Sequence, residues 1–366
     1  MFQNILNCRF NSLRGLTPNP PKGGGYSSRF QALKVVSIAC LSSLLMIGEK
    51  ANAQQIEEFS LVRENAVALN PAMVGIKGFL AGEATFRKQY TQLNGAPYTA
   101  YLMMEGQVAD KNVGIGGSVI QDQTGPTGKT GVTLSASYQL KLGKKYNTSA
   151  TPSGHYNTEA DHMITFGLSF SLMQYRLNGS ELIPNQPGDP QLYTSNSYKL
   201  TPDVAFGMYY QWANHLYAGV SVPQIMGVNV NYTGRDGVSA IKTVQHLNFL
   251  VGGKIEIVKH IFSIDPVAGF RWVDKAPFQG DAGARLTFMD GLWVGAIYRS
   301  ANTVVLEAGL EIKGTVKLSY AYDYHLSSYS MDIGPTHELT LGFRFNHVSP
   351  KHTKFFAGLG ASKSTD

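Results

Sequence analysis

The chain has 366 residues, including 39 glycines, 19 tyrosines and 18 phenylalanines, and only 15% of its residues are charged. Soluble domains average roughly 25% charged residues, so this composition argues against an ordinary globular enzyme. The formal net charge of +6 is concentrated in residues 1–53, which hold six basic residues and one acidic residue. The remainder is nearly neutral and gives no reason to expect nucleic acid as a partner.

A secretion signal is expected early in the chain. Arg29 and Lys34 form a basic region, residues 35–47 are apolar, and Ala51-Asn52-Ala53 fits a small-residue cleavage site. We therefore predict a signal peptide at residues 29–53, cut after Ala53.

Residues 1–28 precede this complete signal, so we interpret them as an upstream extension from a start codon assigned too early. Both cysteines, Cys8 and Cys40, also lie before the cleavage site. The mature chain then begins at Gln54 without cysteine, which excludes disulfides and thiolate chemistry.

Residues 54–75 form a short segment without strand alternation. Asn70-Pro71-Ala72 ends any helix there, because proline disfavours helical backbone at the preceding residue. Before it, four apolar residues have the loose spacing of a short amphipathic helix: Ile56, Phe59, Val62 and Val67. We interpret residues 54–75 as an N-terminal periplasmic segment that plugs, or lies just below, the mouth of a barrel.

Alternation of apolar and polar residues is clearest between residues 303 and 345. A period of two indicates strands, because successive side chains point to opposite faces. In the last of three such runs, Leu339, Leu341, Phe343 and Phe345 alternate with Glu338, Thr340, Gly342 and Arg344. One apolar face and one partly charged face are typical of strands with lipid outside and a wet lumen inside.

The same reading over the whole chain predicts an all-β protein: a transmembrane, antiparallel, up-and-down β-barrel of about 14 strands at residues 76–346, with a tail at 347–366. The predicted strands are 76–89, 97–109, 112–122, 130–142, 161–177, 198–213, 214–224, 244–257, 259–274, 278–289, 290–299, 302–313, 314–325 and 334–346.

Connection lengths mostly alternate between tight turns and long polar loops, as expected for periplasmic turns and outer loops. Residues 143–160 break this rule, because a long link falls where a short turn is expected. Either a strand is miscounted there or the link is a periplasmic insertion.

Catalytic and cofactor signals are weak. Gly114-Ile115-Gly116-Gly117 lies within a strand and opens no helix, so it does not predict a dinucleotide loop. The histidines lack metal-ligand spacing. Charged residues of both signs on the predicted inner faces indicate ion pairs that fill or narrow the lumen. We expect no enzyme activity, no cofactor and no metal.

Several short patterns occur in a characteristic order. They are Leu69-Asn70-Pro71-Ala72 with Gly75, Phe86-Arg87-Lys88-Gln89-Tyr90, Gly95-Ala96-Pro97-Tyr98-Thr99, Gln121-Asp122-Gln123-Thr124-Gly125, Gly295-Ala296-Ile297-Tyr298-Arg299, Ser319-Tyr320-Ala321-Tyr322-Asp323 and Gly334-Pro335-Thr336-His337-Glu338-Leu339. In this order the chain resembles the PorP/SprF family of outer-membrane proteins of Bacteroidota.

The resemblance implies a barrel of the type IX secretion system, which is linked to gliding motility. It implies outer-membrane lipids, secretion ring or translocon proteins and a secreted adhesin as partners. It brings no catalytic residues. The motif positions with an expected structural or lumen-facing role are Asn70, Pro71, Gly75, Arg87, Gln89, Pro97, Asp122, Gly125, Arg299, Tyr322, Asp323, Gly334, His337 and Glu338.

Other functions remain open from the sequence. A transporter of hydrophobic compounds resembling the FadL family also combines about 14 strands with an N-terminal hatch that contains Asn-Pro-Ala. A small-solute porin would not need that segment. A surface-anchored β-sandwich with a binding role is a more distant alternative.

Overall fold

The structure is a computed structural model that describes residues 56–345, except 109–110, 144–147, 151–155, 159–161, 182–196, 214, 232–239, 275, 313 and 327–329. The predicted upstream extension, signal peptide and C-terminal tail lie outside the described residues.

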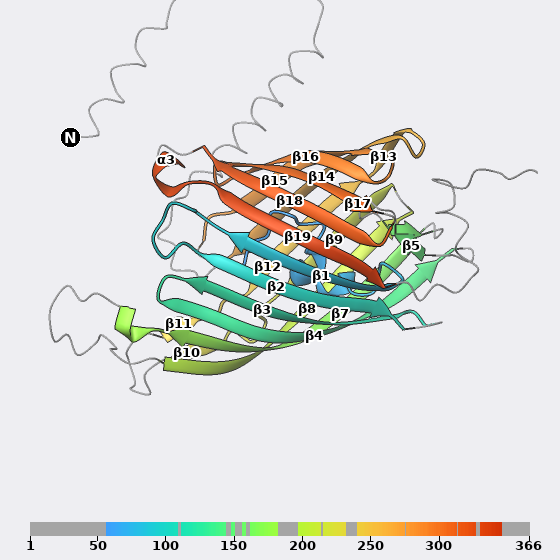
Figure 1. Cartoon of the computed structure of the whole chain (residues 1–366). Helices are drawn as coiled ribbons and strands as arrows, with labels where there is room; N and C mark the ends of the chain where they lie inside the picture. The colour runs from blue at the N-terminus through green and yellow to red at the C-terminus, as the bar shows by residue number, and fades with distance from the viewer. Residues whose placement is uncertain are drawn as a thin grey trace, which may run out of the picture. The chain divides into compact units, whose positions relative to one another are not determined.

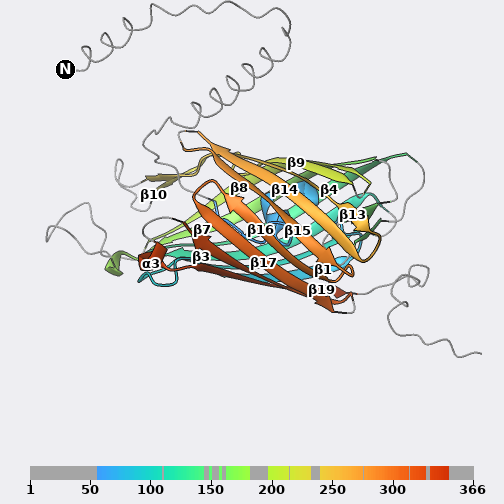
Figure 2. The ribbon, with the colours of Figure 1, turned by 90° about the horizontal axis from the view of Figure 1, so that it is seen from above.

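Fourteen antiparallel strands close into a barrel, as the two perpendicular views show (Figures 1 and 2). Each strand pairs with its neighbour in the chain, and β1 pairs with β19 to close the barrel. The strands are β1 Leu80–Lys88, β2 Tyr98–Gln107, β3 Val113–Thr124, β4 Thr127–Leu142, β7 His162–Leu177, β8 Ser197–Trp212, β9 Leu216–Val222, β12 His246–Gly253, β14 Phe262–Val273, β15 Gln279–Phe288, β16 Leu292–Arg299, β17 Thr303–Ile312, β18 Val316–His325 and β19 Thr336–Phe345. The predicted fold class and strand number are therefore confirmed.

Shorter elements lie in the connections or inside the barrel. Strand β13 continues β12 and pairs with β14 alone. The short elements are α2 Ala66–Leu69, η2 Pro71–Met73, β5 Thr148–Ala150, β6 Tyr156–Thr158, η3 Gly179–Glu181, β10 Asn229–Asn231, β11 Ala240–Lys242, β13 Ile255–Val258 and α3 Ser330–Ile333. No helix among the described residues is long and apolar enough to cross a membrane.

The barrel has two distinguishable ends. We call the end where β1 begins and β19 ends the turn end, because most of its connections are tight. We call the opposite end the loop end, where residues 178–196, 223–245 and 326–335 connect strands. By the convention of single-chain outer-membrane barrels, short turns lie in the periplasm and long loops outside the cell.

The unusual link at 143–161 lies at the turn end. Strands β4 and β7 on either side of it pair directly along their whole length, so no barrel strand is missing. Within the link, β5 and β6 form a separate two-stranded sheet. The strand count was therefore right, and this link is an insertion among the tight turns.

The apolar faces predicted for the last strands point outward. Leu306, Tyr320, Leu339 and Phe343 are exposed on the outer face, whereas Glu307 and Glu338, on the opposite faces of their strands, are buried. The alternation therefore separates a lipid-facing surface from a charged interior, as predicted.

Two local predictions were wrong. The first strand begins at Leu80 rather than residue 76, because Ile76 is fully buried inside and Gly78 has a positive φ of 74°. The expected amphipathic helix is reduced to α2, since the backbone before it donates hydrogen bonds to side chains of the barrel wall.

Leu306→Arg should impair membrane assembly. An arginine on the lipid face costs about 2–4 kcal/mol near the bilayer midplane. The measurement is the yield of folded protein in outer-membrane fractions, detected by heat-dependent gel mobility. Leu93→Arg, the same change at an exposed residue of the 89–97 loop, is the matched control. Equal loss in both variants would show that β17 does not face lipid at this position.

Candidate functional site

Residues 56–79 run through the lumen before β1 begins, and we call them the plug segment. The blue ribbon of this segment is visible between the strands in both views (Figures 1 and 2). Near its start, Glu57 forms an ion pair with Lys129, close to the loop end of β4. Near its finish, the Gly75 amide donates to Glu105, close to the turn end of β2, at 2.8 Å. The segment therefore spans the barrel from the loop end to the turn end.

The inner wall has a charged half and a neutral half. Strands β14 to β19, β1 and β2 place most of the charged residues inside: Glu83, Arg87, Glu105, Asp265, Arg271, Asp281, Arg285, Arg299, Glu307, Glu311, Lys317, Asp323, Glu338 and Arg344. Strands β4, β7, β8, β9 and β12 mainly present small or neutral groups: Ser137, Gln139, Thr165, Ser169, Gln211, Ser221 and Asn248. The plug segment contacts the two halves in different ways.

Arg87 of β1 organises the first charged cluster. Its guanidinium contacts Glu338 and Asp323 at 2.9 Å each. The plug segment completes the cluster, because the Ser60 amide donates to Glu338 and the Ser60 hydroxyl to Asp323, each at 2.7 Å. The Leu61 amide also donates to Glu338 at 3.1 Å. Glu338 therefore holds the backbone of the plug segment, and Asp323 holds its Ser60 side chain.

Arg285 of β15 organises a second cluster, in which Arg285, Glu64 and Glu307 are buried. It contacts Glu307 on the wall at 2.8 Å and Glu64 of the plug segment at 3.1 Å. Lys317 approaches Glu64 from the other side at 3.1 Å, and Arg285 and Lys317 both lie against the ring of Trp293. Burial alone would raise the pKa of Glu64, but the two cations lower it, so the carboxylate stays ionised.

A third cluster lies nearer the loop end than the second cluster does. Glu58 of the plug segment contacts Arg271 and Arg299, which also pair with Asp281. Burial opposes ionisation of Glu58, but the charges of Arg271 and Arg299 prevail and lower its pKa to about 2. Glu58 therefore keeps its charge at any physiological pH.

The neutral half holds the plug segment through close backbone contact. Asn70 is extended, with φ −149° and ψ 112°, and its side chain accepts a hydrogen bond from the Ala72 amide. The same side chain donates to backbone carbonyls of Met208 and Val220 at 3.1 and 3.2 Å. One asparagine thus starts the η2 turn and attaches it to β8 and β9.

Glycines on the wall create the space for this turn. A Cβ atom on Gly167 would lie 2.2 Å from the Ala72 nitrogen, and one on Gly207 would lie 1.9 Å from the Asn70 side-chain oxygen. On β3, a Cβ on Gly114 would lie 2.2 Å from the Val74 carbonyl oxygen. We call Gly114, Gly167 and Gly207 the glycine seat. This contact places Gly114 on the lumen side of β3.

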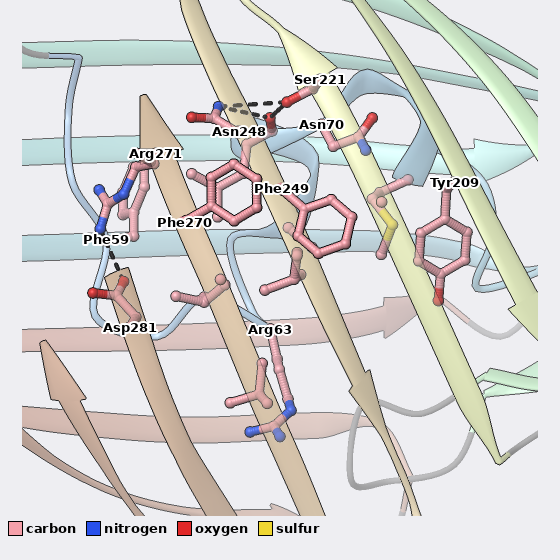
Figure 3. Close-up of a pocket in the computed structure, with 18 of the residues that line it drawn as sticks. Phe59, Arg63, Asn70, Tyr209, Ser221, Asn248, Phe249, Phe270, Arg271 and Asp281 are labelled. Carbon is pink, nitrogen blue, oxygen red and sulfur yellow. Dashed lines mark hydrogen bonds and ion pairs between the residues drawn. The ribbon is translucent and has the colours of Figure 1, made fainter. Parts of the chain in front are cut away.

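A small cavity of about 60 Å³ remains between the plug segment and β9, β12 and β14 (Figure 3). Its lining is mainly apolar and includes Phe59, Val62, Leu69, Leu250 and Val267. In Figure 3, Arg271 and Asp281 form an ion pair on one side of this space. The cavity has no constellation of nucleophile and base, and the described residues contain no group of three or more histidine, cysteine or carboxylate side chains that could hold a metal.

The structure brings only some of the predicted motif positions together. Arg87, Asp323 and Glu338 form the first cluster, and Arg299 lies 3.6 Å from Asp323. Asn70 and Pro71 lie on the glycine seat.

The other predicted positions are separate from these clusters. Gly75 lies at the turn end of the plug segment, and Asp122 accepts from Thr99 on the inner face of β3. Four positions lie in loop-end connections: Gln89, Pro97, Gly125 and Gly334. Tyr322 and His337 lie on the outer face, with ring centroids 5.4 Å apart, so of the two expected roles only the structural one is open to them.

Sequence reasoning missed the plug residues that complete the clusters, namely Ser60, Glu58 and Glu64. A signal was present, because acidic residues precede Asn70 in a segment expected to meet a barrel with inward arginines. It also missed Gly167 and Gly207, whose inward position among polar neighbours was a usable sign of close backbone approach.

Gly167→Ala should displace the η2 turn, because its new methyl group collides with backbone atoms that cannot rotate away. We expect more frequent or larger ion conductance for the purified protein in planar bilayers. Gly117→Ala is the control, since its Cβ would meet only ordinary contacts, the nearest at 3.5 Å. Unchanged conductance in Gly167→Ala would indicate that the seat does not hold the lumen closed.

Arg87→Met should loosen the plug segment, because it leaves Glu338 and Asp323 buried without their main cation. Breaking a buried ion pair by removing one partner costs about 3–5 kcal/mol. The expected result is faster protease cleavage within residues 56–79 of the folded barrel, followed by mass spectrometry. Lys88→Met, at an exposed neighbour on the same strand, should leave cleavage unchanged.

Solved structures with a similar arrangement are distant. The CymD monoaromatic hydrocarbon channel matches with a TM-score of 0.45 and 12% identity, over 81% of this chain and 95% of that chain. A Pseudomonas aeruginosa FadL homologue matches with a TM-score of 0.43 and 9% identity, over 77% of this chain and 94% of that chain. The Acinetobacter baumannii outer membrane protein Omp33 matches with a TM-score of 0.41 and 10% identity, over 74% of this chain and 100% of that chain.

Comparison with curated proteins finds no match. The sequence profile of one family, described as type IX secretion system membrane protein PorP/SprF, matches residues 51–343. This range covers the plug segment and nearly the whole barrel, and it confirms the resemblance seen in the sequence. The chain therefore belongs to the PorP/SprF family of type IX secretion system membrane proteins.

Proposed function

We propose that this protein is a non-enzymatic outer-membrane component of the type IX secretion system that supports export or surface anchoring of adhesins linked to gliding motility. We further propose that it acts as a binding scaffold and that cargo does not pass through its lumen. The observation that carries this proposal is the plug segment, which is attached to both halves of the inner wall.

The attachments support a lumen that stays closed at rest. Ser60, Leu61 and Glu64 engage wall charges, and Asn70 and Gly75 engage the wall nearer the turn end. Opening the barrel would break these contacts together and leave several buried charges unpaired, which is costly in a low-dielectric interior. A polypeptide would meet this barrier before it could enter.

The partners that we propose are outer-membrane lipids around the barrel, secretion ring or translocon proteins, and a secreted adhesin. The insertion at 143–161 is the longest connection at the turn end, and β5 and β6 give it a hairpin of its own. If the turn end faces the periplasm, this insertion is the part best placed to meet a periplasmic ring protein.

Replacing residues 144–160 by a two-residue Asn-Gly turn tests this scaffold role. Affinity-purified wild-type protein should retain secretion ring or translocon proteins, and the shortened variant should lose them while keeping heat-dependent gel mobility. A variant with residues 183–195 of the loop end replaced by the same turn is the control. Absence of any secretion protein from the wild-type sample would contradict the proposal.

A transporter of small hydrophobic compounds is the second candidate, and the apolar cavity beside Leu69 favours it. At about 60 Å³ this cavity is too small for a long acyl chain. Uptake of a monoaromatic compound by vesicles containing the wild-type protein, abolished by Leu250→Trp in the cavity, would support this candidate over the scaffold.

A further inference from the structure

The direction of the plug segment carries an inference that is independent of the secretion role. Its first residues lie at the loop end. Glu57 pairs with Lys129, two residues after the start of β4, and Glu58 pairs with Arg299, the last residue of β16. Both strand ends adjoin loop-end connections, at 125–126 and 300–302.

Its last residues lie at the turn end. The Gly75 carbonyl accepts from Gln139 at 3.2 Å, and Lys77 pairs with Glu83 and Glu105. Strand β1 then starts at Leu80 and returns toward the loop end. The chain thus crosses the barrel once inside the lumen and a second time in the wall.

A cavity of about 370 Å³ lies where the plug segment starts, and we call it the mouth cavity. Ile56, Glu57 and Glu58 of the plug segment line it, together with Arg271 of β14. The lining also includes residues of the β14–β15 connection and the β16–β17 turn, among them Pro277, Phe278, Ser300 and Ala301. The mouth cavity is therefore a feature of the loop end.

We propose that the mature amino terminus occupies the mouth cavity and is accessible from the cell surface. Cleavage after Ala53 leaves only Gln54 and Gln55 before Ile56, and two residues reach at most about 7 Å. Ile56 itself lines the cavity, so Gln54 and Gln55 begin within its reach. The occupant of the cavity is therefore this chain's own first residues.

A single introduced thiol tests the proposal. The two cysteines of the chain lie at positions 8 and 40, so the processed protein has none. In Gln55→Cys, a membrane-impermeant maleimide linked to polyethylene glycol should label intact cells, and the mass shift is read on a blot. Leu93→Cys in a loop-end connection should label likewise, whereas Asn112→Cys in a turn-end connection should label only after the outer membrane is opened.

Labelling of Gln55→Cys that requires an opened outer membrane, or that fails under both conditions, overturns the proposal. A second readout is independent of thiol reactivity: an epitope inserted between Gln54 and Gln55 should bind antibody on intact cells. Binding only in lysed cells, or a purified protein that still begins before Gln54, would also overturn it. None of these outcomes depends on secretion partners, so they are separate from the test of the scaffold role.

Discussion

Buried charge is the constraint on which the rest of this structure depends. A barrel wall that alternates between lipid and lumen must put its charged residues inside, where an unpaired charge is expensive. In this protein the wall does not satisfy all of its own charges. Glu338 and Asp323 share Arg87 but also accept hydrogen bonds from Ser60, and Arg285 joins Glu307 of the wall to Glu64 of the plug segment. The plug segment is therefore part of the interior and not an addition to a finished pore.

The two halves of the lumen hold the plug segment by different kinds of contact. On the charged half the contacts are ion pairs and charge-assisted hydrogen bonds, which are strong only while both partners remain buried. On the neutral half Asn70 donates hydrogen bonds to wall carbonyls, and Gly167 and Gly207 leave the space that the η2 turn needs to come this close. Opening the lumen therefore requires both kinds of contact to break. This combination is the basis of the proposed scaffold role.

The path of the chain also decides at which end of the barrel its first and last described residues lie. The plug segment runs from the loop end to the turn end. Residue 56 therefore lies at the loop end, whereas β19 finishes at the turn end. The insertion between β4 and β7 and the mouth cavity thus lie at opposite ends of the barrel. One protein can then present separate surfaces on the two sides of the membrane.

The sequence by itself determined the barrel, its strand number and the direction of its faces. Strict alternation, as in β17, fixes which face is buried, with Glu307 inside and Leu306 outside. It also predicted ion pairs in the lumen, which follow from the alternating pattern of the strands. The end of any helix at Asn70-Pro71 follows from the backbone restriction that proline places on the preceding residue. Only the tertiary structure decided that Arg87, Asp323 and Glu338 meet Ser60. These contacts depend on strand stagger and on partners more than 200 residues apart, as in the pair of Ser60 and Glu338, and no local period encodes them.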